Sequence, residues 1–236
     1  MRLAATLLAC GLALSACTEP VLVATTVPQP VVAPPPVTLE GRSKGRMFVE
    51  VVERVEPVAE RICRQATVGR NCDYLIVVDD RPGQPPNAFQ TVDELGRPII
   101  AFTLSLIAET RNADEIAFVL AHEAAHHIAG HLEKSQQTAL AGAIVFGELA
   151  SIFGAGETGV AEAQRLGAAV GVRTYSKGFE LEADALGTRI AAAAGFDPVR
   201  GAEFFFRLPD PENVFLSTHP ANSDRVRVVR ETAANL

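Results

Sequence analysis

Two histidines and a glutamate in one short stretch have the types and spacing needed to bind a metal ion and to use it in hydrolysis. The stretch is an HExxH motif that begins at His122 and ends at His126. Asn112 can cap a helix that starts at the next residue, and neither proline nor glycine interrupts that helix before Gly130. Residues four apart on a helix share a face, so both imidazoles can reach one ion. Glu123 lies where its carboxylate can take the proton of an attacking water.

An HExxH motif also arises by chance on ordinary helices. Here the turns that lead into the motif are rich in alanine, isoleucine, leucine and valine, which predicts that the helix carries the motif into an apolar core. Buried polar side chains need partners, and a metal ion supplies one for the whole group. The surrounding sequence therefore favours a metal site over a chance match.

A catalytic zinc ion needs a third protein ligand. One class of zinc peptidase supplies a histidine ten residues after the first, but that position is Leu132 here. A glutamate on a later helix is the other option. Glu180 and Asp184 lie four apart and so share a helical face. This spacing would place Glu180 on the metal and leave Asp184 to hold a ligand histidine.

Three motifs follow one another along the chain: HEAAH at 122–126, YSKGFELEAD at 175–184, and THP at 218–220 followed by Arg225. In this order they resemble those of the gluzincin zinc metallopeptidases of the HtpX and CAAX prenyl protease family. The resemblance extends in particular to soluble periplasmic members of that family, such as BepA and the lipoproteins LoiP and YcaL, and it covers residues 46 to 230.

The resemblance implies a ligand set and a fold. One zinc ion per chain is expected on His122, His126 and Glu180, with Glu123 as the general base and Asp184 behind the ligands. The expected fold is α+β and mostly α, with a small β-sheet beside the active-site helix.

The resemblance also implies roles for residues outside the ligand set. His219 would lie near the metal, where it can stabilise the oxyanion or occupy the open coordination position. Arg225 would anchor the loop that carries His219 or polarise the scissile carbonyl. Asn87, Ala88 and Phe89 would form a strand beside the cleft that takes up substrate backbone by strand addition. The alternative is that Phe89 fills the core.

Two further histidines follow the motif. His127 points about 100° away from His126. It is predicted to be a polar surface residue or to contact a metal ligand without binding the metal itself. His131 lies five residues beyond His126, and structural packing is the preferred interpretation over metal contact.

The N-terminal residues have the pattern of a bacterial lipoprotein signal. A positive residue, a short apolar run and a small residue before Cys17 predict a signal peptide over residues 1–16 and lipidation of Cys17. The alternative is a plain secretory signal that is cut near Ala16. Thr18 in place of aspartate implies, for such lipoproteins, sorting to the outer membrane. We therefore expect a periplasmic protein whose lipid inserts into the inner leaflet of that membrane.

Residues 17–45 are rich in proline, valine and threonine, which predicts an extended, lipid-anchored linker. The metallopeptidase domain is expected over residues 46–236. Once the signal peptide is removed and Cys17 is lipidated, Cys63 and Cys72 are the remaining pair, and an oxidising compartment favours a disulfide between them. Zinc binding by this pair is the weaker alternative, since no CxxC spacing supports it.

Apolar periodicity and turn residues predict the elements around the motif. The segment at 139–172 is rich in alanine and glycine, but its charged residues argue against a transmembrane hairpin. We expect two helices there, with a mobile glycine-rich connection that can cover the cleft as a lid. The other predicted elements are a helix over 48–66 with a kink or break at Pro57, strands over 74–78, 87–92 and 98–103, and a short helix over 104–109.

The formal net charge of −7 argues against nucleic acid as a partner. Together with the resemblance, the motifs predict a zinc metalloendopeptidase of the bacterial cell envelope. Its polypeptide substrates would be misfolded or unassembled envelope proteins, so that it serves quality control. The alternative is a zinc-binding lipoprotein that acts as a chaperone or assembly factor without proteolysis, and the intact Glu123 argues against it. A purely structural lipoprotein would leave the three-ligand set unexplained.

Overall fold

The computed structural model describes residues 38–207 and 221–236, apart from the side chains of residues 173–175. The predicted signal peptide, the Cys17 lipidation site and His219 lie outside this part of the chain. The elements are α1 (Leu39–Ala66), β1 (Leu75–Asp79), β2 (Ala88–Val92), β3 (Pro98–Thr103), α2 (Leu104–Glu109), α3 (Ala113–Ala129), α4 (His131–Ile152), α5 (Glu157–Ala193), α6 (Pro198–Ala202), the 3-10 helix η1 (Glu203–Arg207) and α7 (Asn222–Ala233).

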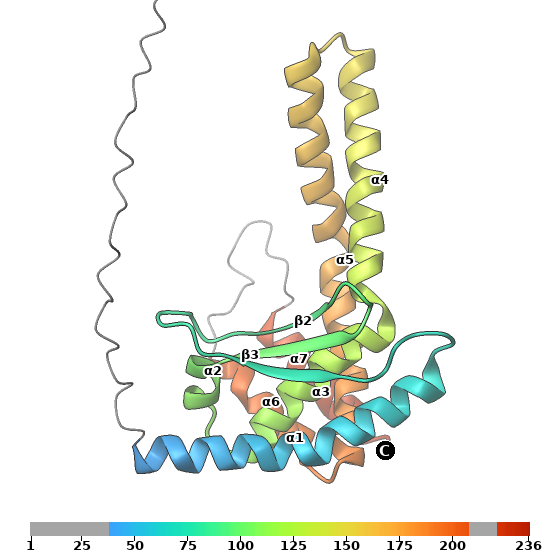
Figure 1. The fold of residues 1–236 in the computed structure, drawn as a ribbon. Coiled ribbons are helices and arrows are strands. Elements are labelled where there is room, and N and C mark those ends of the chain that lie inside the picture. The colour runs from blue at the N-terminus through green and yellow to red at the C-terminus, as the bar shows by residue number, and fades with distance from the viewer. Residues whose placement is uncertain (1–37, 208–220) are drawn as a thin grey trace, which may run out of the picture. The chain divides into compact units, whose positions relative to one another are not determined.

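Helix α3 forms the centre of the domain (Figure 1). Asn112 caps it by accepting a hydrogen bond from the Glu115 amide at 3.1 Å, and Gly130 ends it at a φ of 70°. Most of its residues are buried, and it contacts α1, α5, α6 and β2. A helix that is apolar on nearly all sides must lie inside a domain. The prediction that the HExxH helix enters an apolar core is therefore confirmed.

Helix α1 begins earlier than the sequence indicated. Residues 39–45 are helical, although they were expected to belong to the linker, because Thr38 caps the first turn through the Gly41 amide at 3.0 Å. Of the two predicted alternatives at Pro57, a kink or a break, the break is wrong, since the helix continues through it. Proline has no amide hydrogen, so Pro57 leaves the carbonyl of Glu53 without its usual helical partner. Both residues are exposed, so water can bond that carbonyl.

The three strands form one small sheet in the order β1-β3-β2. β1 runs parallel to β3, and β2 runs antiparallel to it, with Phe89 opposite Ala101. Within the described residues β2 is an edge strand, so one row of its backbone groups is left for another chain. The expected α+β fold, mostly α with a small sheet beside the metal-binding helix, is confirmed.

A disulfide joins Cys63 at the end of α1 to Cys72 just before β1. The short loop that it closes lies against the end of α3. Its Asn71 carbonyl accepts a hydrogen bond from His127 Nε2 at 2.7 Å, and Arg70 Nη1 pairs with Glu133 Oε1 at 2.8 Å.

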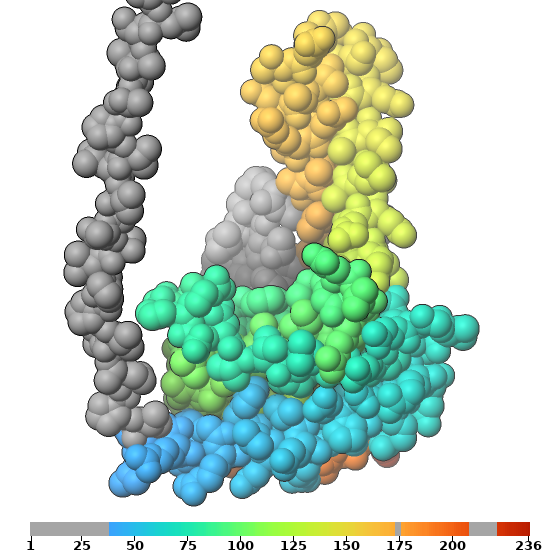
Figure 2. All heavy atoms as spheres, in the orientation of Figure 1, coloured from blue at the N-terminus to red at the C-terminus, as the bar shows by residue number. Residues whose placement is uncertain are grey.

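Helices α4 and α5 form an antiparallel hairpin (Figures 1 and 2). Its far end projects away from the other helices and the sheet of the described domain, which are called the body below. The two predicted helices are present, but the expected lid is not. The connection between them is at the far end of the hairpin, and only residues near its base line the active-site cavity. No helix in the described ranges has an apolar stretch long enough to cross a bilayer.

Candidate metal centre

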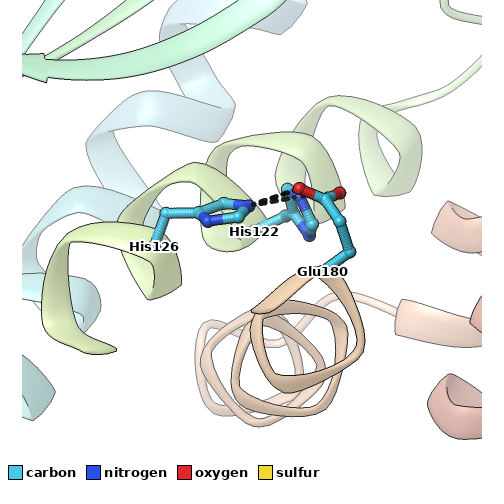
Figure 3. Close-up of side chains that lie close together, drawn as sticks. All are labelled: His122, His126 and Glu180. Carbon is cyan, nitrogen blue, oxygen red and sulfur yellow. Dashed lines mark hydrogen bonds and ion pairs between the residues drawn. The ribbon is translucent and has the colours of Figure 1, made fainter. Parts of the chain in front are cut away.

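The two motif histidines point from α3 toward α5, where Glu180 meets them (Figure 3). His122 Nε2 and His126 Nε2 are 3.0 Å apart. The Glu180 carboxylate oxygens lie 3.5 Å from His122 Nε2 and 3.3 Å from His126 Nε2. One ligand atom from each of the three residues therefore falls within 4.8 Å of the others.

This donor set fits a divalent metal ion. Two imidazole nitrogens and one carboxylate oxygen are the ligands of a common type of catalytic zinc site, which keeps a further position for water or substrate. Three such atoms converge here (Figure 3), and Arg225 Nη2 lies beside them, 3.4 Å from His122 Nε2 and 3.6 Å from Glu180 Oε2. The two Nε2 atoms also face each other, so a cation between them would satisfy both lone pairs. The residues that the sequence singled out as ligands are thus brought together.

Asp184 and Arg225 support His122 from behind. The fully buried Asp184 carboxylate lies 2.9 Å from His122 Nδ1, which leaves Nε2 to face Glu180. Arg225 bonds the same carboxylate through Nε at 2.8 Å and Nη2 at 2.7 Å, and its guanidinium lies 3.6 Å from the centre of the Phe205 ring. A bidentate pair of this kind fixes the carboxylate in one orientation. Arg225 thus uses two of its donors on Asp184.

The buried charges shift one another's pKa values. Burial alone would lower the pKa of His122, but hydrogen bonds to Asp184 and Glu180 outweigh it and raise that pKa to about 10. Burial would raise the pKa of Asp184, but its bonds to Arg225 and His122 outweigh burial and hold it below its usual value. The buried Asp184 carboxylate is therefore held as the anion that both Arg225 and His122 contact.

Glu123 and the strand β2 line a cavity of about 480 Å³ above the ligands. Asn87, Ala88 and Phe89 form part of its wall, as the family resemblance implied. Phe89 is 41% exposed and does not fill the core, so that alternative is wrong. The edge strand and the ligand cluster therefore share one cavity, in which an extended backbone could lie beside the metal.

The other two histidines of α3 and α4 are both buried, at 3% exposure each. His127 is held by the Asn71 carbonyl and the edge of the Tyr74 ring, so the prediction of a surface position is wrong. His131 packs on Phe179, as expected, with ring centres 4.5 Å apart. It also contacts the ligand His126, with the two Nδ1 atoms 2.9 Å apart. Burial lowers the pKa of His131 to about 4, despite its bond to Glu182.

Sequence reasoning missed Glu182. It lies between Glu180 and Asp184 in the sequence, but it does not share their four-residue helical spacing. Its carboxylate lies 3.2 Å from His131 Nε2. The only available signal was the density of acidic residues in this turn of α5. Phe205, a buried residue of the core, also lines the cavity, and the Arg225 guanidinium lies over its ring.

Several proteins of known type are similar to this chain. A Vibrio cholerae serotype O1 homologue is 33% identical over 147 residues, which is 57% of this chain and 30% of that protein. A Yersinia pestis protein named beta-barrel assembly-enhancing protease is 31% identical over 142 residues, 55% of this chain and 29% of the relative. The mitochondrial metalloendopeptidase OMA1 of Schizosaccharomyces pombe is 31% identical over 153 residues, 62% of this chain and 43% of the relative.

The matched region thus spans less than half the length of each of these relatives. A match to the family described as Peptidase family M48 covers residues 50–233. That range contains the HExxH helix, Glu180 and the residues that support them. The chain therefore belongs to peptidase family M48, a family of metallopeptidases.

Proposed function

We propose that this protein is a zinc-dependent endopeptidase. The observation that carries the proposal is the convergence of His122, His126 and Glu180 on one point, at the cavity that Glu123 also lines. Zinc bound to these three residues would act as a Lewis acid on the scissile carbonyl and lower the pKa of the attacking water. Membership of peptidase family M48 supports the same conclusion.

The protein's own residues would carry out the proton transfers and the positioning. Glu123 would accept the proton of the attacking water and return it to the leaving amine. Asp184, held by Arg225, would keep His122 in the tautomer that presents Nε2 to the metal. Arg225 would then act through Asp184, and it also lines the cavity.

The substrate would lie along β2 as an additional strand. Its backbone would pair with the free edge at Ala88 and Phe89, and its side chains would enter the cavity alternately. Recognition through backbone groups suits polypeptides that are unfolded or unassembled, since a folded protein does not offer a free strand. We therefore propose misfolded or unassembled envelope proteins as substrates. The name of the Yersinia pestis relative, beta-barrel assembly-enhancing protease, supports a role of such a protease in protein assembly.

The periplasmic location and the lipid anchor at Cys17 remain part of the same proposal. They depend on the sequence pattern of residues 1–16, and Cys17 would hold the enzyme at the outer membrane through the linker that follows. The disulfide between Cys63 and Cys72 agrees with an oxidising compartment. Metabolic labelling with a radioactive fatty acid, compared with Cys17→Ser, would test the anchor.

Cleavage of an unfolded protein such as casein tests the enzymatic proposal. Wild type and Glu123→Gln should each bind one zinc ion per chain, and the variant should lose cleavage by about 10²–10⁴-fold because it lacks the general base. Absence of zinc from the wild type would refute the proposal. Zinc without cleavage, together with suppression of aggregation of an unfolded client, would instead favour a chaperone.

A further inference from the structure

The buried His131 ring has a polar partner at each of its two nitrogens. Nδ1 lies 2.9 Å from His126 Nδ1, and Nε2 lies 3.2 Å from Glu182 Oε2. The ring also stacks on Phe179 at an interplanar angle of 18°, which fixes its plane. A histidine that served only to fill space would not need both nitrogens aligned with polar atoms at hydrogen-bond distance.

A turn at Gly130 makes the contact between the two histidines possible. In one continuous helix, residues five apart point about 140° away from each other and do not meet. Gly130 has a φ of 70°, ends α3 and begins α4, so the chain changes direction between His126 and His131. Glycine adopts this left-handed conformation readily, whereas other residues are strained in it. The backbone thus returns the His131 ring to the ligand ring.

The two contacts assign a proton to each ring, provided that His126 binds the metal as proposed above. His126 presents Nε2 to His122 and Glu180, so its neutral ring carries the proton on Nδ1. That N–H can only donate to His131 Nδ1, which must then be the acceptor. His131 consequently carries its own proton on Nε2, where it donates to the Glu182 carboxylate.

We propose that His131 and Glu182 are positioning residues that hold His126 in the orientation and tautomer that bind the metal. His122 receives the same support directly from Asp184, whereas His126 receives it from Glu182 through the ring of His131. One turn of α5 would then supply a ligand and the carboxylates behind both histidines. Such outer hydrogen bonds raise the basicity of a metal-binding imidazole and restrict its rotation.

Zinc affinity measured by competition with a chromogenic chelator tests the proposal. His131→Phe keeps a ring to stack on Phe179 but removes both nitrogens, and it should bind zinc about 10–100-fold more weakly than the wild type. His131→Asn places an acceptor near the position of Nδ1 and should recover part of the loss. Glu182→Gln keeps an acceptor without the charge and should give a smaller loss than His131→Phe.

His127→Phe is the matched control, because His127 is as buried as His131 but does not contact a ligand. It should bind zinc as tightly as the wild type. If His131→Phe also binds like the wild type, or if both variants weaken binding equally, the proposal is overturned and the enzymatic proposal stands. If the wild type binds no zinc, both proposals fail.

The tautomers can also be measured without any variant, which keeps the test decisive if His131→Phe does not fold. Nitrogen-15 NMR of the zinc-loaded wild type should show the proton of His126 on Nδ1 and that of His131 on Nε2. A proton on His131 Nδ1 instead would contradict the chain of hydrogen bonds.

Discussion

The two halves of α5 pack in opposite ways. Toward its C-terminal end the helix is part of the body, where Asp184, Thr188 and Ile190 are fully buried against α3 and its neighbours. Toward its N-terminal end, among the described residues, it packs against α4, and every residue of 157–172 except Gly167 is exposed or half-buried. The candidate metal site depends on the C-terminal half, which carries Glu180 and Asp184, whereas the described hairpin residues that line the cavity lie near its base.

Glycines show the difference most directly. In the body, a Cβ at Gly187 would lie 3.0 Å from the backbone nitrogen and Cα of His122, so this glycine lets α5 approach the ligand helix. In the hairpin, a Cβ at Gly167 would lie 2.1 Å from the Gly142 carbonyl oxygen. The body is held together by close backbone contacts and also by a core of large side chains. The hairpin depends on close backbone contacts, and it leaves apolar side chains of α4 exposed. These are Leu140, Ile144, Val145, Leu149 and Ile152.

Asp184→Asn should have the largest effect, because it removes a buried charge from the body and leaves the buried Arg225 without its bidentate partner. We expect a loss of about 3–5 kcal/mol in the free energy of unfolding, measured by urea denaturation with a chelator present. Asp224→Asn is the control, since Asp224 forms an exposed pair with Arg227. Equal stability of the two variants would show that the buried pair does not stabilise the body.

Gly187→Ala should have an intermediate effect. The added methyl group would meet the backbone of α3 at His122, which cannot move like a flexible side chain, so we expect a loss of about 1–3 kcal/mol together with weaker zinc binding. Gly178→Ala is the control in the same helix, because a Cβ there meets nothing within 4 Å. It should be neutral or stabilising by up to about 1 kcal/mol. Urea denaturation and chelator competition would measure both variants.

Gly167→Ala should have the smallest effect on the body. The methyl group would force α4 and α5 apart where they cross, so amide hydrogen exchange should accelerate in the hairpin. Exchange in α3 and zinc affinity should match the wild type. Slower exchange in the hairpin, or a fall in zinc affinity as large as that of Gly187→Ala, would mean that the two regions are not separable.

Local spacing in the sequence predicted much of the candidate site. Helical periodicity placed His122 and His126 on one face, and the same four-residue rule selected Glu180 and Asp184. The strand over 98–103 and the helix over 104–109 were predicted with the observed bounds. These features depend on residues that are neighbours in the chain, so a pattern can reveal them.

Features that depend on chain reversal were not predictable from spacing. His131 meets His126 only because Gly130 turns the backbone, and a continuous helix would have kept them apart. Arg225 meets Asp184 across 41 residues of sequence, so the bidentate pair follows from how α7 packs on α5. The hairpin was predicted as two helices, but its direction away from the cleft follows from packing at its base.

The disulfide between Cys63 and Cys72 lowers the entropic cost of folding at one end of α3. Cys63 and Cys72 are nine residues apart, and closing so short a loop removes unfolded conformations worth about 2.5–3 kcal/mol in the chain-entropy account. The closed loop carries the Asn71 carbonyl that holds His127, next to the candidate ligand His126. Oxidation of two cysteines outside the cavity therefore lowers the entropic cost of assembling the far end of the metal-binding helix.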